Sequence, residues 1–330
     1  MQPPPIHALR LGLLQLLSGA ALAFDFHYES IALDTGATLG CLIAGAPRNA
    51  TAGTIVFLHG FPEGSWAWSG ILATGLLDEF TLVAPDQRGY NRSSQIPGHY
   101  AITDTVADAT ALVRLFADMR GRVHLVAHDW GGAVAWWLAA AHPELLHSLT
   151  ILNMAHPLGW ISEVRDNPIQ QATSAYVLYF VNPASTAGMT ANGDAALKGS
   201  FAGEAWFDAA QEAAYTASWQ VDGSVNAALD WYRENVRPRC ALNCTAPACF
   251  NEGVESTFDA MPHNGTIPGR TLVLWGMKDT AFDNAGQLAF IPTKVTGRLN
   301  VTRFPSNSHW LGQEAPEAVA RAILAWCSQP

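Results

Sequence analysis

Residues 126–132 of this chain, VAHDWGG, decide its fold. The apolar run before them, residues 123–126, is typical of a buried parallel strand. The small residues Gly131 and Gly132 open an apolar run that predicts a helix ending at His142-Pro143. A strand that turns sharply into a helix indicates an α/β fold with Asp129 at the turn.

Asp129 occupies the place that a serine nucleophile holds in turns of the G-x-S-x-G type. Such a turn needs small residues two positions before and after the nucleophile, and Ala127 and Gly131 meet this need. A serine there attacks a carbonyl, whereas a carboxylate suits displacement at a saturated carbon. Asp129 is therefore a candidate nucleophile toward strained or activated alkyl groups; the alternative is a helix-capping aspartate.

Two candidate partners follow later strands. Asp279 comes after the apolar run 272–276, and His309 comes after the run 301–305. The order nucleophile, acid, histidine is the one that elbow hydrolases require. Because the carboxyl ends of parallel strands meet at one edge of a sheet, we expect the three side chains to converge there. His309 would be the general base and Asp279 would orient it.

A tight loop follows the earlier apolar run 54–58 and reads HGFPE at residues 59–63. In elbow hydrolases this loop and the residue after the nucleophile supply the backbone N–H groups of an oxyanion hole. The candidates here are Phe61 and Trp130. Taken alone, the loop could be an ordinary Gly-Pro turn.

Together these motifs resemble the soluble epoxide hydrolases of the α/β-hydrolase family. The resemblance covers nearly the whole chain after the N-terminal segment and departs at Ala127, where that family usually has Gly. It implies an α/β-hydrolase fold: a mainly parallel eight-stranded sheet flanked by helices, with a helical cap inserted between strands 149–154 and 272–275. It also implies that Tyr176 and Tyr232, both in the cap, donate hydrogen bonds to the epoxide oxygen.

The tyrosine pair suits this chemistry. Opening an epoxide produces an alkoxide, and a phenol with a reference pKa near ~10 can protonate it. Aromatic side chains on cap helices also commonly pack, so packing is the alternative. Trp66 and Tyr179 are further candidates for contact with substrate. The reaction implied is that of an apolar epoxide and water giving a vicinal diol through an ester on Asp129, with no cofactor and no metal.

Two other functions compete with this one. Haloalkane and haloacid dehalogenases share the nucleophile and the base, and the indole of Trp130 could hold a halide. Phe61, where dehalogenases commonly have Asn, and the two tyrosines favour epoxides. A hydrolase-fold ligand receptor or carrier without catalysis is the third possibility, but no member of the catalytic set is missing.

Composition fits a large folded enzyme. With 330 residues, 49% hydrophobic and 14% charged, the chain can bury an extensive core. A net charge of −10 argues against nucleic acid as a partner, since phosphate binding needs a basic face. The domains expected are a signal peptide (1–23), a first core segment (24–157), a helical cap with a Cys-rich insertion (158–262) and a second core segment (263–330).

The N-terminus predicts a secreted or lumenal protein. His7 and Arg10 precede an apolar run at 11–17, and Ala21-Leu22-Ala23 fits a signal-peptidase site. The run is shorter than the about 20 residues that span a bilayer, so we expect no integral membrane segment in the mature chain. Glycosylation sequons occur at Asn49, Asn91, Asn243, Asn264 and Asn300.

The cysteines agree with such a compartment. Cys240, Cys244 and Cys249 cluster in one loop-like stretch, and in an oxidising lumen two of the three would pair. A zinc site is the alternative, but the spacing has no CxxC and no convincing fourth ligand. Cys41 and Cys327 would be buried thiols or a second pair.

Overall fold

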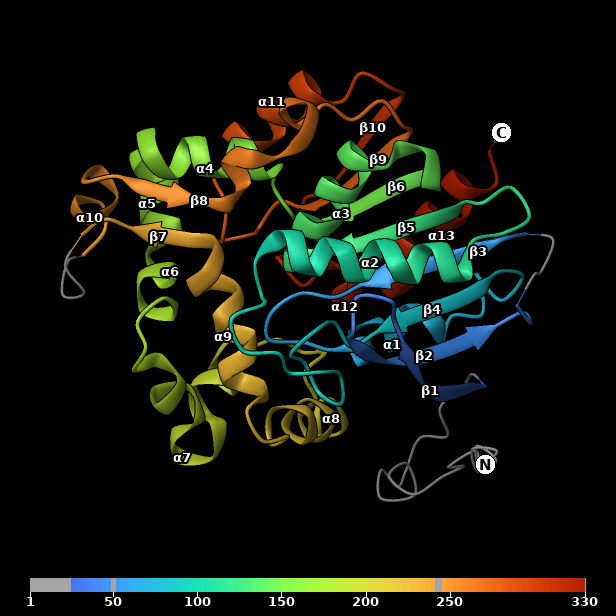
Figure 1. The fold of residues 1–330 in the computed structure, drawn as a ribbon, viewed down its shortest axis with the longest axis horizontal. Coiled ribbons are helices and arrows are strands. Elements are labelled where there is room, and N and C mark those ends of the chain that lie inside the picture. Colours follow the sequence, from blue (N-terminus) through green and yellow to red (C-terminus); the bar gives the residue numbers. More distant parts are fainter. Residues whose placement is uncertain (1–24, 49–51, 241–244, 330) are drawn as a thin grey trace.

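A central sheet of eight strands organises the molecule, in the order β1-β2-β4-β3-β5-β6-β9-β10 (Figure 1). The computed structural model describes residues 25–48, 52–240 and 245–329. β2 runs antiparallel to both of its neighbours, and the other neighbouring pairs are parallel. The predicted eight-stranded, mainly parallel sheet is confirmed. Its strands are β1 (Phe26–Ala32), β2 (Thr38–Gly45), β3 (Thr54–Leu58), β4 (Thr81–Pro85), β5 (Val123–His128), β6 (Leu146–Leu152), β9 (Thr271–Gly276) and β10 (Leu299–Phe304).

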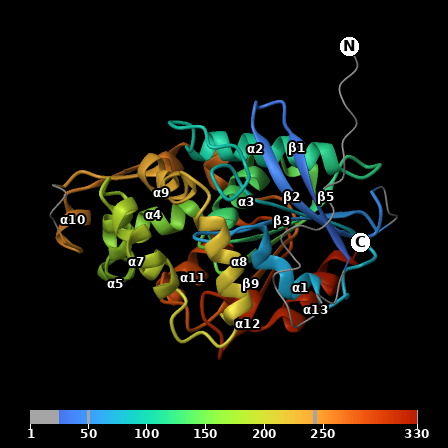
Figure 2. The same ribbon diagram turned by 90° about the horizontal axis from the view of Figure 1, so that it is seen from below.

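Helices cover both faces of the sheet (Figure 2). Every residue of β3, β4, β5 and β9 is buried, which explains why these strands read as continuous apolar runs rather than alternating ones. One face packs against α2 (Ile102–Phe116), α3 (Asp129–Ala141) and α11 (Asn284–Lys294). The other face packs against η2 (Ser65–Trp68), α1 (Ser69–Leu72), α12 (Leu311–Glu314) and α13 (Pro316–Cys327), and η3 (Pro143–Leu145) joins α3 to β6.

The region between β6 and β9 is mostly helical and gathers beside the sheet (Figures 1 and 2); we call it the cap. The predicted boundaries at 158 and 262 stay predictions. Its helices are α4 (Pro157–Asp166), α5 (Pro168–Thr173), α6 (Ala175–Phe180), α7 (Ser185–Gly199), α8 (Ala209–Trp219) and α9 (Ser224–Asn235). A small hairpin and short helices follow, namely β7 (Val236–Pro238), α10 (Ala248–Asn251), β8 (Val254–Ser256), η4 (Thr257–Ala260) and η5 (Pro262–Gly265).

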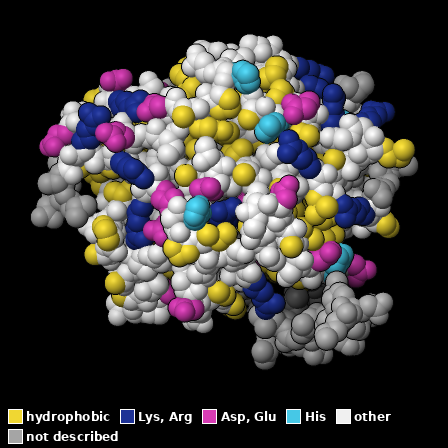
Figure 3. All heavy atoms as spheres, in the orientation of Figure 1, with side chains coloured by type: hydrophobic (Ala, Val, Ile, Leu, Met, Phe, Trp, Pro, Cys, Tyr) yellow, Lys and Arg dark blue, Asp and Glu magenta, His cyan; other side chains and the backbone are white. Residues whose placement is uncertain are grey.

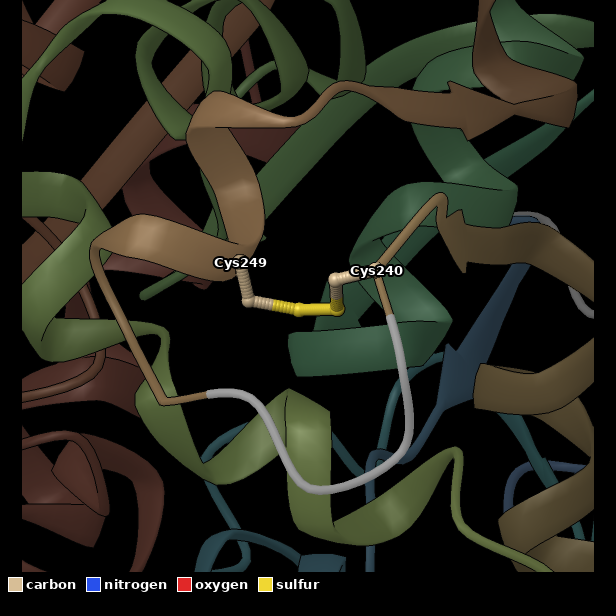
Figure 4. Close-up of a disulfide and its surroundings, with 2 residues drawn as sticks. All are labelled: Cys240 and Cys249. Carbon is tan, nitrogen blue, oxygen red and sulfur yellow. A yellow bond between two sulfur atoms is a disulfide. The ribbon is translucent and has the colours of Figure 1, made fainter.

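A disulfide joins Cys240, just after β7, to Cys249 in α10 (Figure 4). This confirms the prediction that two of the three clustered cysteines pair, while Cys244 lies outside the described residues. Cys41 and Cys327 are free, buried thiols, and burial raises the pKa of each to about 12. In the described ranges, no group of His, Cys, Asp and Glu is arranged to hold a metal ion.

The predicted signal peptide and the sequons at Asn49 and Asn243 lie outside the described residues. Asn264 and Asn300 are exposed, whereas Asn91 is half-buried and donates through Nδ2 to Asp86 Oδ2 at 2.8 Å. Across residues 25–48, 52–240 and 245–329, none of the helices combines the length and apolarity that a membrane span requires. On the face drawn in Figure 3, Lys and Arg side chains occur at several separate places.

Candidate active site

The turn between β5 and α3 forces Asp129 into an unusual backbone conformation. Its φ is +47°, in the left-handed region that Asp and Asn tolerate better than most residues. α3 then starts directly against the loop at 59–63, where the Gly131 N–H donates to the His59 carbonyl at 3.0 Å. A Cβ on Gly131 would lie 2.3 Å from the Leu58 oxygen, so this position needs glycine. The helix thus begins at Asp129, two residues earlier than predicted.

The three side chains expected to converge do so. His309 Nδ1 lies 2.8 Å from Asp279 Oδ2, and its Nε2 lies 3.6 Å from Asp129 Oδ2. Asp279 follows the end of β9, and His309 lies in the loop between β10 and α12. Because Nδ1 donates to Asp279, the imidazole is held with Nε2 toward Asp129.

Charges in this group stabilise one another. Burial opposes ionisation of Asp129, but the hydrogen bond and charge of His309, with the charge of His128 and the Phe61 N–H, hold the pKa of its carboxyl below the ordinary range. Burial also opposes a charged imidazole, yet Asp279 and Asp129 together raise the pKa of His309 well above its usual value. The resting group is therefore a carboxylate beside an imidazolium.

Asp279 is itself held from two sides. The Asn153 amide donates to Oδ2 at 2.7 Å, and the Ala281 backbone N–H donates to Oδ1 at 2.7 Å. Asn153 stands just past β6 with a φ of +39°, another left-handed position at the same edge of the sheet. These donors fix the carboxylate that orients His309.

The loop at 59–63 brings a backbone donor to Asp129. The Phe61 N–H donates to Asp129 Oδ1 at 2.8 Å. His59 shapes this loop, since its Nδ1 donates to the Gly60 carbonyl at 2.9 Å and its Nε2 accepts from the Gln87 N–H at 3.0 Å. Burial lowers the pKa of His59 to about 4, so the ring is neutral and can serve as both donor and acceptor. Trp130 lies in the first turn of α3, where backbone N–H groups have no intrahelical acceptor.

The two cap tyrosines lie next to each other. Tyr176 in α6 and Tyr232 in α9 have ring centroids 6.2 Å apart. The ring of Tyr232 also packs edge-on against Phe61 at 5.4 Å and Trp130 at 4.9 Å. Burial, and then the negative charge of Asp129, raise the pKa of both phenols well above the ordinary value. Both phenols therefore keep their protons.

The further candidates for contact with substrate, Trp66 and Tyr179, pack against other elements. Trp66 packs edge-on against Phe26 of β1, with ring centroids 6.1 Å apart. Tyr179 is 46% exposed, and its hydroxyl lies against Gly188 of α7. It follows Tyr176 by three residues, which rotates it by roughly 60° around an ideal helix. Their predicted role as substrate contacts stays a prediction.

A buried chain of hydrogen bonds beside the site was not predicted from the sequence. Glu63 Oε2 lies 3.0 Å from His128 Nδ1, and His128 Nε2 lies 2.9 Å from the His309 carbonyl oxygen. Glu63 Oε1 accepts from the Tyr215 hydroxyl at 2.9 Å and from the Gln313 side-chain amide. Glu63 directly follows HGFP and His128 directly precedes Asp129, so adjacency to predicted site residues was the available signal for these two.

Comparison with known sequences identifies relatives along most of the chain. The family model described as alpha/beta hydrolase fold matches residues 53–316. The AB hydrolase superfamily protein YfhM of Bacillus subtilis is 30% identical over 278 residues, which cover 82% of this chain and 89% of that protein. Epoxide hydrolase 4 of Mus musculus is 27% identical over 292 residues, which cover 83% of this chain and 73% of that protein.

Solved structures agree with the observed fold. A structure reported among novel epoxide hydrolases of the alpha/beta hydrolases superfamily, from metagenomes of hot environments, has a TM-score of 0.78 at 27% identity and covers 93% of this chain and 100% of that one. An epoxide hydrolase from Bacillus megaterium, solved with an inhibitor, has a TM-score of 0.76 at 25% identity and covers 91% and 100%.

Proposed function

Because this chain belongs to the alpha/beta hydrolase fold family, we propose that it is an epoxide hydrolase, which converts an apolar epoxide and water to a vicinal diol. One observation carries the proposal: the elbow holds a carboxylate, Asp129, and two cap tyrosines, the buried Tyr232 and the partly buried Tyr176, lie near enough for its charge to raise their pKa. A carboxylate nucleophile needs a carbon with a leaving group, and the phenols provide donors for a leaving oxygen. Several of its relatives are named epoxide hydrolases.

In the first step Asp129 attacks one epoxide carbon and the carbon–oxygen bond breaks. The alkoxide that forms accepts a proton from Tyr176 or Tyr232, which leaves a hydroxyalkyl ester on Asp129. The imidazolium of His309 returns the proton to the phenolate through water. The imidazolium of His309 is less stabilised at this stage, because the Asp129 carboxylate beside its Nε2 has become a neutral ester.

In the second step neutral His309, oriented by Asp279, takes a proton from water. The hydroxide attacks the ester carbonyl of Asp129, and the oxyanion is stabilised by the Phe61 N–H and the Trp130 N–H. The diol leaves, and the Asp129 carboxylate and His309 imidazolium are restored. Water oxygen therefore enters Asp129 first, so a single turnover in oxygen-18 water should label Asp129 and little of the diol.

The proposed substrate is apolar around the epoxide. The ring of Tyr232 is surrounded by the rings of Phe61, Phe180 and Trp130, at centroid distances of 5.4, 5.0 and 4.9 Å. Aromatic faces bind hydrocarbon groups and exclude water, so a substrate with an aryl or alkyl chain next to the epoxide suits this site.

A paired assay tests the function. The purified protein and its Asp129→Ala variant are offered a panel of aromatic and fatty epoxides beside a panel of chloro- and bromoalkanes. Diol formation by the wild type and not by Asp129→Ala is the expected result. Halide release without diol would transfer the chain to the dehalogenases, and stoichiometric binding of apolar ligands with no turnover would favour a receptor or carrier.

We also propose that the chain is secreted or lumenal. The disulfide between Cys240 and Cys249 supports this, because such bonds persist mainly in oxidising compartments. In a eukaryotic secretory host, the mature protein should begin at Phe24, and treatment with an N-glycosidase should lower its mass. Retention of residues 1–23 in the folded product would contradict the signal-peptide prediction.

A further inference from the structure

Cap helix α8 is joined to the loop at 59–63 by two hydrogen bonds. The Trp219 indole N–H donates to the Pro62 carbonyl at 2.6 Å, and the Tyr215 hydroxyl donates to Glu63 Oε1 at 2.9 Å. Tyr215 is 3% exposed and Trp219 is 6% exposed. The same loop carries the Phe61 N–H that reaches Asp129, so a cap helix contacts the oxyanion donor segment directly.

A chain of hydrogen bonds connects Glu63 through His128 to His309, the proposed base. His128 Nε2 must donate to the His309 carbonyl, because a carbonyl oxygen only accepts. Glu63 Oε1 accepts from Tyr215 and from Gln313, and Glu63 Oε2 lies 3.0 Å from His128 Nδ1. His128 therefore links the buried Glu63 side chain to the main chain of His309.

We propose that Tyr215 is a positioning residue for ester hydrolysis: by docking α8 on Glu63 it fixes, through His128, the main chain that carries the base His309. The cap then completes the hydrolytic arrangement as well as covering it. This inference rests on the proposed function. It assigns a role to a side chain of α8, separate from the two phenols of α6 and α9 that face the epoxide.

The proposal predicts which half-reaction suffers. Ester formation depends on Asp129 and on the phenols of Tyr176 and Tyr232. Ester hydrolysis depends on His309 and on the Phe61 N–H, the two groups to which α8 is connected. Loss of the Tyr215 hydroxyl should therefore lengthen the lifetime of the ester more than it slows its formation.

The test is a single-turnover experiment with an aromatic epoxide, quenched in acid and read by intact-protein mass. In Tyr215→Phe we expect the ester on Asp129 to decay about tenfold more slowly, with its formation changed by less than about twofold. The matched control is Thr216→Val on the same helix, which removes a hydroxyl that has no hydrogen-bond partner among the described residues. Its ester should form and decay as in the wild type.

A double-mutant cycle adds a readout that general loosening would not move. In a Glu63→Gln background, Tyr215→Phe should have little further effect on ester decay, because both changes interrupt one chain. Additive effects, or an unchanged ester lifetime in a folded Tyr215→Phe protein, would overturn the proposal. If Tyr215→Phe does not fold, Trp219→Phe takes its place, because it removes the neighbouring hydrogen bond to Pro62. This variant must also slow ester hydrolysis selectively. Equal slowing of ester formation and ester hydrolysis would count against the proposal. If the intact-protein mass of the wild type shows no ester at all, the proposed function fails. If the wild type forms the ester but Tyr215→Phe does not prolong its lifetime, only the present inference fails.

Discussion

The Asn153 amide donates to the same Asp279 oxygen that accepts from His309, with distances of 2.7 and 2.8 Å. That oxygen is thus held by one neutral donor, the Asn153 amide, and by one donor that is charged at rest, the His309 ring. We predict that Asn153→Asp lowers kcat by about tenfold or more, because it replaces the donor with a second carboxylate and leaves Asp279 repelled and misoriented.

Steady-state kinetics of that variant would check this, with circular dichroism to confirm folding. Asn226→Asp is the control, since it adds the same charge on the exposed side of α9. A folded Asn153→Asp protein with wild-type kcat would show that the amide does not orient the acid.

The two cap phenols lead to a second prediction. Tyr176→Phe and Tyr232→Phe should each slow ester formation by about 10- to 100-fold, and the double variant should lose nearly all activity. Because burial and the charge of Asp129 raise the pKa of each phenol, each hydroxyl keeps its proton, and so remains a donor, at alkaline pH. The rate of ester formation should therefore stay level through pH 10, where an ordinary phenol is half ionised.

Rapid-mixing fluorescence would follow this step, since Trp130 packs on Tyr232. Tyr28→Phe, a change on the exposed strand β1, is the control. Ester formation that proceeds normally in the double variant would reduce both tyrosines to packing residues.

The sequence predicted those site residues whose place is set by the strand or turn directly beside them in the chain. Asp279 and His309 each follow the end of a strand, and Asp129 stands in a turn whose small neighbours are visible in the sequence, so their meeting follows from the parallel sheet. Ala127, where the resembling family has Gly, is fully buried in β5, and the turn after it still forms.

Residues that depend on how the cap docks could not be predicted in this way. Tyr215 meets Glu63 across 152 positions of sequence, and nothing local marks a tyrosine on an amphipathic helix as its partner. The contacts of Trp66 with β1 and of Tyr179 with α7 likewise depend on side-chain direction, which the sequence does not give, and their role as substrate contacts stays a prediction. Packing between elements, rather than pattern within them, decides these cases.

Close approach at Gly60 leads to a third prediction. A Cβ there would lie 2.3 Å from the Cβ of Asp129 and 2.5 Å from its Oδ1, far inside contact distance. Gly60→Ala must therefore displace Asp129, the proposed nucleophile, or the Phe61 N–H, and we expect a loss of kcat of about 100-fold or more, since small misplacements of reacting groups cost that much.

Gly199→Ala is the matched control for Gly60→Ala, because an added Cβ at Gly199 meets nothing within 4 Å. Thermal unfolding of both variants separates misplacement from loss of the fold. A folded Gly60→Ala enzyme with normal kcat would mean that the loop and Asp129 move apart without functional cost.

The last prediction concerns acid stability and His156, which follows β6. Its Nε2 donates to the Gly265 carbonyl at 2.9 Å, while its Nδ1 is buried without a hydrogen-bond partner among the described residues. Burial lowers the pKa of His156 to about 4. Between this pH and about pH 6.5, the imidazole is therefore neutral in the folded state but protonated in the unfolded chain. The stabilisation is complete above pH 6.5 and is lost as the pH falls from there toward 4. At pH 5 this imidazole alone should reduce the free energy of unfolding by about 2 kcal/mol.

Urea unfolding at pH 7.5 and pH 5 tests this. Between these two pH values the free energy of unfolding should fall less in His156→Gln, by about that amount, than in the wild type or in the exposed-site control His27→Gln. Equal acid losses in all three proteins would mean that His156 becomes charged without cost in the folded state.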